Sequence, residues 1–211
     1  MPVAVRMQRD ERIDDIVRVT TELIGKKGYY GTSIQEIADN VGLSQAGVLK
    51  HVKTKKNLLE LVLAQYDGDD SDNQANGYLK KKRELSEGEL EKSPALLPEW
   101  YREIARYNAQ NPFFTRAYLV LRAEALDESH PAHDYFEQRG RRLRAFVSAV
   151  PWKLPPEYAT PESKAVLSMA VGSAMEGLES RWLGEEGIDF LEYWGKYEDI
   201  LFPLPHWEGY R

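Results

Sequence analysis

The sequence contains no cysteine among its 211 residues. Disulfide bonds, thiolate nucleophiles and cysteine-based zinc sites are therefore excluded. Long hydrophobic runs are also missing, and every apolar run falls far short of the ~20 residues that a membrane span needs. Residues 1–10 lack the apolar core of a signal peptide. We therefore expect a cytoplasmic protein.

Signals for β-strands are scarce, because no Asn-Gly or Asp-Gly turn joins two alternating apolar segments. A glycine-rich phosphate loop and a Gly-x-Ser-x-Gly nucleophile turn are missing as well. Hydrophobic residues make up 42% of the chain and charged residues 29%, which is typical of a globular protein. We predict an all-α fold of about nine helices. We also expect that the protein is not an enzyme and that it needs no cofactor or metal.

Negative charge is unevenly distributed along the chain. The net charge is −6, yet residues 1–60 contain ten Lys or Arg and eight Asp or Glu, so the negative excess lies after residue 60. A polyanion such as DNA favours a basic surface. A mildly basic N-terminal part followed by an acidic body is therefore compatible with nucleic-acid binding.

Four helices are indicated in the first 67 residues. In the first helix, apolar residues recur at helical spacing, namely Ile13, Ile16, Val17, Leu23 and Ile24. Gly28 is expected to end this helix. Ser33 and Glu36 form a capping box at the start of a short second helix, which ends at Gly42. Ser44 caps a third helix over residues 45–52, and Thr54 caps a fourth.

The second and third helices, joined by Gly42, Leu43 and Ser44, form the pattern of a helix-turn-helix. The third helix is expected to present Gln45, Ala46, Gly47 and Lys50 on its free face, where a recognition helix meets base edges. Side chains around it are candidates for phosphate contacts: Thr32, Ser33, His51, Lys53 and Lys55. The alternative for each of these residues is an ordinary solvated cap or surface lysine.

Residues 9–67 resemble the DNA-binding domain of the tetracycline repressor (TetR) family. The matching segments are Lys27-Gly28-Tyr29, Thr32-Ser33, Ile37-Ala38, Val41-Gly42-Leu43-Ser44, His51-Val52-Lys53-Thr54-Lys55 and Leu58-Leu59. The sequence departs from the family at Leu49, where a tyrosine that contacts phosphate is usual. The resemblance implies double-stranded operator DNA as partner, and repression as the mode of action.

A polar loop is expected at 68–93. After it, the acidic body is predicted to consist of helices, most of which start at a polar residue followed by proline. Ser93-Pro94, Asn111-Pro112, His130-Pro131 and Thr160-Pro161 indicate helix starts, and Asp189 with Glu192 indicates the last one. We expect a helix-turn-helix domain at 1–54 and a helical ligand-binding and dimerisation domain at 55–211. The segment Leu121–His133, with Tyr135 and Phe136, resembles a turn between two body helices of the same family.

The body is expected to form a homodimer and to bind an unknown small-molecule effector. The dimer is expected to pack as a four-helix interface of its last two helices, through Leu167, Val171, Ala174, Leu178, Trp182, Leu191 and Trp194. The alternative is that this stripe forms the core of a single chain. Apolar and aromatic residues are candidates for lining the effector pocket: Trp100, Ile104, Tyr107, Phe114, Tyr118, Met169 and Ser173.

Two other functions fit parts of the sequence. A helical metal-dependent enzyme could use His130 and His133 with a carboxylate such as Glu124, although a third ligand is not evident. An architectural DNA-binding protein would not need a body of some 140 residues. The interpretation that accounts for most of the chain is a regulator released from a palindromic operator by a ligand.

Overall fold

The computed structural model describes residues 3–67, 78, 82, 88–89 and 93–211. Nine α-helices and one short 3-10 helix form this part of the chain, so the predicted all-α class is confirmed. The polar loop predicted at 68–93 lies almost entirely outside the described residues. Among the described helices, none has the length and apolar character that crossing a bilayer requires.

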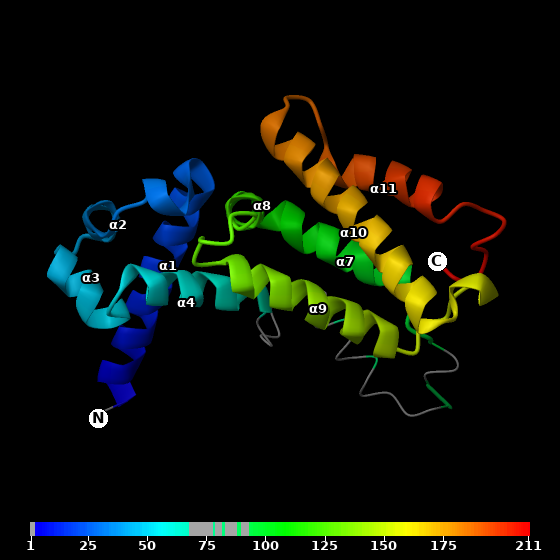
Figure 1. Cartoon of the computed structure of the whole chain (residues 1–211), viewed down its shortest axis with the longest axis horizontal. Coiled ribbons are helices and arrows are strands. Elements are labelled where there is room, and N and C mark those ends of the chain that lie inside the picture. The colour runs from blue at the N-terminus through cyan, green and yellow to red at the C-terminus, as the bar shows by residue number, and fades with distance from the viewer. Residues whose placement is uncertain (1–2, 68–77, 79–81, 83–87, 90–92) are drawn as a thin grey trace. The chain divides into compact units, whose positions relative to one another are not determined.

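The helices follow the sequence closely in the N-terminal part (Figure 1). They are α1 (Val3–Gly31), α2 (Ile34–Val41), α3 (Gln45–Val52) and α4 (Lys55–Asp67). Helix α1 is interrupted at Gly28, where φ is 76° and ψ is 174°. A residue with this positive φ is favoured as glycine and interrupts the helix, as predicted for Gly28. Residues 29–31 add a last turn to α1 beyond this break.

The helices of the body are α7 (Leu97–Gln110), α8 (Pro112–Glu124), α9 (His133–Ala149), α10 (Pro161–Gly184) and α11 (Phe190–Leu201). Two predicted caps are confirmed: Thr160 Oγ1 accepts from Ser163 N at 3.1 Å, and Asp189 Oδ1 accepts from Glu192 N at 2.9 Å. Two predicted starts are wrong by a few residues. Helix α7 begins at Leu97 after Leu96, not at Pro94, and α9 begins at His133, after a turn that contains Pro131.

The chain divides into two compact units. Residues 1–68 and 113–137 form unit 1, which contains α1 to α4 and α8. Residues 69–112 and 138–211 form unit 2, which contains α7, most of α9, α10 and α11. The functional boundary that the sequence suggests between residues 54 and 55 stays a prediction.

Each unit has its own apolar core. In unit 1 the core joins α1, α2 and α3 to α4 and α8 through Ile16, Ile24, Ile37, Val48, Leu58, Val62, Ala117 and Leu121. In unit 2 it contains Leu97, Tyr101, Val147, Val171, Leu178, Trp194, Phe202 and Trp207. Burial of these side chains is the main stabilising contribution to each unit.

Polar contacts fix the helix pairs of unit 2. Tyr101 Oη on α7 hydrogen bonds the Ser168 carbonyl oxygen on α10 at 2.8 Å. Arg102 Nη2 donates to Glu198 Oε2 on α11 at 2.7 Å, and Glu198 is buried. Helix α7 is therefore tied to both C-terminal helices by groups that are costly to leave unpaired.

Candidate DNA-binding site

The turn between α2 and α3 depends on Gly42. Its φ of 68° and ψ of 35° lie in the left-handed region, which glycine adopts without steric cost. The amide of the next residue, Leu43, donates to the Ala38 carbonyl at 2.9 Å, and Ala38 is completely buried. A small residue at Ala38 and a glycine at 42 thus let the two helices pack closely across a sharp turn.

Serine caps set the starts of both helices. Ser33 Oγ accepts from Glu36 N, and Ser44 Oγ accepts from Gly47 N, each at 3.1 Å. The other half of the predicted capping box is replaced by an ion pair, because the Glu36 carboxylate binds the Lys27 ammonium. This ion pair ties the end of α1 to the start of α2.

Helix α3 has one buried side and one exposed side. Val48 and Val52 pack into the core of unit 1, with exposed fractions of 0% and 3%. The opposite side, which we call the recognition face, consists of Gln45, Ala46, Leu49 and Lys50. Gln45, Ala46 and Lys50 are exposed and Leu49 is half-buried. The face therefore offers an amide, a methyl group, a leucine and a cation along one helical stripe.

The other residues predicted near DNA differ in exposure. Ser33 and Lys53 are exposed, and His51 is half-buried. Gly47 is half-buried too, and a Cβ atom there would lie 3.3 Å from Ser44 Oγ. Lys53 has a φ of 65°, which directs the chain from the end of α3 into α4. Contacts of these residues with DNA stay predictions.

Two residues predicted to bind phosphate have partners inside unit 1. Thr32 is 2% exposed, and its hydroxyl donates to the Gly28 carbonyl oxygen at 2.8 Å. Lys55 Nζ donates to the Tyr29 carbonyl oxygen at 2.6 Å and lies 4.2 Å from the centroid of the Tyr29 ring. Burial lowers the pKa of Lys55, and the charge of Glu124 opposes this shift. Both side chains thus hydrogen bond backbone carbonyl groups of unit 1, and their contacts with DNA stay predictions.

One contact in this region could not be found from sequence. Glu124, the last residue of α8, accepts a 2.9 Å hydrogen bond from Tyr29 N. The two residues are 95 positions apart, and no local spacing or motif links them.

The structure also changes the interpretation of the predicted dimer stripe. Four of its members lie in the core of unit 2, namely Leu167, Val171, Leu178 and Trp194. Ala174 and Trp182 are half-buried, Trp182 stacks on Phe190, and Leu191 is 45% exposed. A stripe at spacing i, i+4 marks a buried side without saying whether the same chain buries it. Most of the stripe therefore belongs to the core of the chain itself, which was the alternative.

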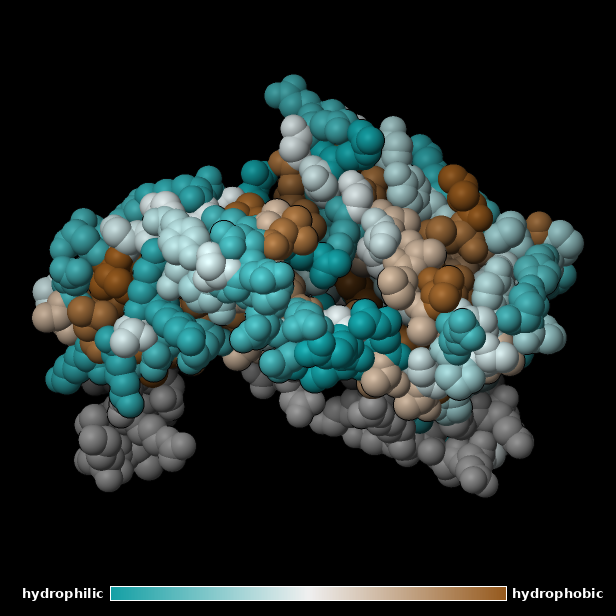
Figure 2. Space-filling model, viewed as in Figure 1, coloured by the Kyte–Doolittle hydropathy of each residue, from teal (hydrophilic) through white to brown (hydrophobic). Residues whose placement is uncertain are grey.

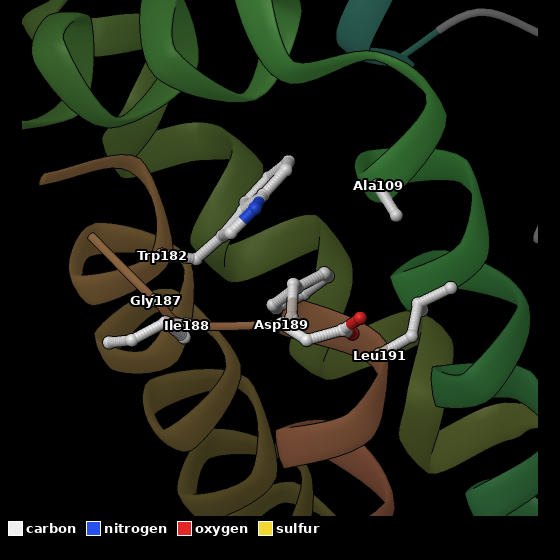
Figure 3. A pocket seen from close by; sticks show the side chains of 7 residues that line it. Ala109, Trp182, Gly187, Ile188, Asp189 and Leu191 are labelled. Carbon is white, nitrogen blue, oxygen red and sulfur yellow. The ribbon is translucent and has the colours of Figure 1, made fainter. Parts of the chain in front are cut away.

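The predicted effector-pocket residues are divided between the two units. Trp100, Ile104 and Tyr107 lie on α7 in unit 2, whereas Phe114 and Tyr118 lie on α8 in unit 1. Met169 and Ser173 are exposed on α10. An open hollow of about 550 Å³ in unit 2 has other lining residues: Ala109, Trp182, Gly187, Ile188, Asp189, Phe190 and Leu191 (Figure 3).

The two histidines considered as metal ligands lie in different environments. His130 is 3% exposed, and its Nδ1 accepts from Ala132 N at 3.1 Å. His133 Nδ1 contacts the Ala125 carbonyl oxygen at 2.9 Å. Ligand atoms of His133, Asp134 and Glu137 lie within 4.8 Å of one another, without His130. The pair required for the metal-dependent enzyme is thus not assembled in the described residues.

The comparisons with known proteins agree with this geometry. Residues 16–62 match the family model of bacterial regulatory proteins of the tetR family. No curated protein sequence matches the chain at a significant level.

Two solved structures share the fold. One, described as a TetR-family transcriptional regulator from Rhodococcus sp., has a TM-score of 0.56 at 21% identity, over 91% of this chain and 98% of its own. Another, described in the same terms, from Mesorhizobium loti MAFF303099, has a TM-score of 0.53 at 17% identity, over 92% of this chain and 94% of its own. At these identities the likeness shows the fold.

The helix-turn-helix of unit 1, with its exposed recognition face, defines a DNA-binding transcription regulator. The family match covers residues 16–62, so it is this segment that is similar to the bacterial regulatory proteins of the tetR family.

Proposed function

We propose that the chain is a homodimeric repressor in the cytoplasm, released from a palindromic operator when a small molecule binds to its body. The observation on which this proposal rests is the exposure of Gln45 and Lys50 on a capped α3 whose Val48 and Val52 are buried in unit 1. The family resemblance favours repression over activation.

The recognition face is suited to the major groove. Gln45 can form two hydrogen bonds with adenine, Ala46 can contact a thymine methyl group, and Lys50 can reach guanine or a phosphate. Leu49 offers a further apolar contact where a tyrosine is usual in the family. Ser33, His51 and Lys53, around the helix, are suited to phosphate contacts that fix the register.

The proposed dimer uses the side of α10 that faces away from the core of unit 2. Val166 and Met169 on α10 are 60% and 54% exposed, and Leu191 and Ile200 on α11 are also exposed. Figure 2 shows hydrophobic residues gathered on the surface over these two helices. Large exposed apolar side chains on neighbouring helices favour a second copy as their cover, in a two-fold arrangement. Two-fold symmetry in turn favours an operator with half-sites about 34–36 Å apart.

We place the effector in unit 2, against the aromatic residues of α7. Trp100, Ile104 and Tyr107 lie there, and Nε1 of Trp100 and of Trp194 is buried without a hydrogen-bond partner among the described residues. An unpaired buried donor costs about 1–3 kcal/mol. A largely apolar ligand with an oxygen acceptor would therefore be stabilised by binding at this position. A coupling free energy of ~1–3 kcal/mol between the ligand site and the DNA-binding helices would then release DNA.

Selection of DNA duplexes from a random pool tests the proposal directly. The dimeric protein should enrich one palindromic sequence, and members of a panel of apolar compounds with carbonyl or carboxylate oxygens should weaken its binding by about tenfold. Enrichment of no sequence would contradict the DNA-binding part. Enrichment of a single, non-palindromic half-site would contradict the dimer.

A further inference from the structure

Glu124 is the last residue of α8, at a position that the helix itself does not favour. A carboxylate at a helix C-terminus is destabilised by the partial negative charge of the last carbonyl groups. Its side chain nevertheless reaches the last turn of α1, beyond Gly28, where Oε2 accepts from Tyr29 N at 2.9 Å. A carboxylate makes stronger hydrogen bonds to backbone amides than a neutral acceptor does. The position of Glu124 is therefore explained by the turn that it contacts and not by α8.

The carboxylate lies directly against the backbone of Gly28. A Cβ atom on Gly28 would lie 2.0 Å from Glu124 Oε1, closer than real atoms approach, and 3.0 Å from its Cδ. The φ of 76° at this residue also disfavours any side chain. Gly28 thus serves two purposes: it breaks α1, and it lets the end of α8 approach the peptide group of Tyr29 that follows.

The peptide groups of Tyr29 are held from two sides. Glu124 accepts from its N–H, and Lys55 Nζ donates to its carbonyl oxygen at 2.6 Å. Lys55 is the first residue of α4, which follows α3 after Lys53 and Thr54. The end of α8, the last turn of α1 and the start of α4 therefore meet at Tyr29.

The ring of His130 is the third group at this point. It lies edge-on to the rings of Tyr29 and Tyr30, at centroid distances of 5.4 Å. Its Nδ1 accepts from Ala132 N, so the ring proton is on Nε2, which lies 3.5 Å from Glu124 Oε2. The turn after α8 thus places the buried His130 Nε2 near the same carboxylate, without a hydrogen bond to it.

We propose that Glu124 is a positioning residue that couples the recognition helix to the body of the protein. Helix α8 follows α7 of unit 2 after the single residue Asn111. A displacement of α8 moves the carboxylate, and with it the Tyr29 peptide and the starts of α2 and α4 on either side of α3. This inference rests on the proposed function, because it supplies the route by which a ligand in unit 2 changes DNA affinity.

The coupling can be measured without the effector, because coupling between two sites is reciprocal. All five tryptophans of the sequence lie in unit 2: Trp100, Trp152, Trp182, Trp194 and Trp207. Binding of a duplex to α3 should therefore change tryptophan emission, excited at 295 nm, although unit 1, which contains the DNA-binding residues, has no tryptophan. The probe is the duplex enriched from the random pool.

Two variants of similar size separate positioning from packing. Glu124→Gln keeps an oxygen acceptor for Tyr29 N and should retain most of the emission change. Glu124→Leu keeps the bulk without an acceptor and should lose at least half of the emission change at saturating duplex. Glu128→Ala, four residues further along in the exposed turn, is the matched control and should behave as wild type. An undiminished response in Glu124→Leu would overturn the proposal.

Hydrogen exchange in the wild type provides a test that needs no variant, in case Glu124→Leu does not fold. The exchange rate of the Tyr29 amide should change at least threefold when the duplex binds, with the same concentration dependence as the emission. Unchanged exchange at Tyr29, or bound duplex without any change in emission, would overturn the coupling while leaving DNA binding intact. Failure to bind any duplex would instead contradict the DNA-binding function itself.

Discussion

Asn108 on α7 donates a 2.6 Å hydrogen bond from Nδ2 to Oε1 of Glu179 on α10, where Glu179 is 3% exposed. Burial raises the pKa of Glu179 from 4.5 to about 7, and the hydrogen bond from Asn108 opposes this shift. The carboxyl group is therefore largely protonated in the folded protein at pH values where it is ionised in the unfolded chain.

Glu179→Gln should remove a pH dependence of stability. A raised pKa in the folded state gives stability that is present below pH 4.5 and lost as pH rises through about 7. The free energy of unfolding of the wild type, relative to the variant, should fall by about 3 kcal/mol between pH 4.5 and pH 8. Urea unfolding followed by tryptophan fluorescence at both pH values measures this difference. A constant difference across the range would show that Glu179 is ionised in the folded state.

Two lysines near α3 should have different effects when their charge is removed. Lys53→Met should weaken binding to all duplexes alike and reduce the slope of log affinity against log salt by about one, because an exposed cation contacts phosphate. Lys55→Met should leave that slope unchanged and lower the free energy of unfolding by about 1 kcal/mol, because its partner is the Tyr29 carbonyl. Salt titrations of DNA binding and urea unfolding measure the two effects. A reduced salt slope in Lys55→Met would return Lys55 to the DNA contacts.

Met169→Glu should separate the dimer without unfolding the chain. Met169 is 54% exposed on α10, so a charge there is tolerated in the monomer but not between two apolar faces. Sedimentation velocity should show a monomer at micromolar concentration, and affinity for a palindromic duplex should fall at least tenfold. Gln138→Glu adds the same charge at an exposed position of α9 and should remain dimeric. A dimeric Met169→Glu protein would place the interface elsewhere.

Local signals in the sequence were sufficient to predict most helix boundaries. The caps at Ser33, Ser44, Thr160 and Asp189 act within three residues, so their spacing alone identifies them. The helix end at Gly42 was equally predictable from sequence, because a short helix followed by glycine is a local feature.

Features that depend on distant partners could not be predicted in the same way. The stripe containing Val171 and Leu178 was correctly identified as apolar, but its spacing does not say whether the same chain or a second copy covers it. The hydroxyl of Thr32 and the ammonium of Lys55 have acceptors in the carbonyl groups of Gly28 and Tyr29, at the break of α1. The contact between Glu124 and Tyr29 joins segments that only the folded core of unit 1 brings together.

The base preference of Gln45→Ala tests the central claim that the exposed side of α3 reads DNA. The variant and the wild type should be compared on duplexes that differ from the enriched sequence at one position each. Gln45→Ala should lose discrimination at an adenine position by about 1–3 kcal/mol, with the salt dependence of binding unchanged. If the variant keeps the same preference at every position of the half-site, α3 is not the helix that recognises DNA in the way proposed.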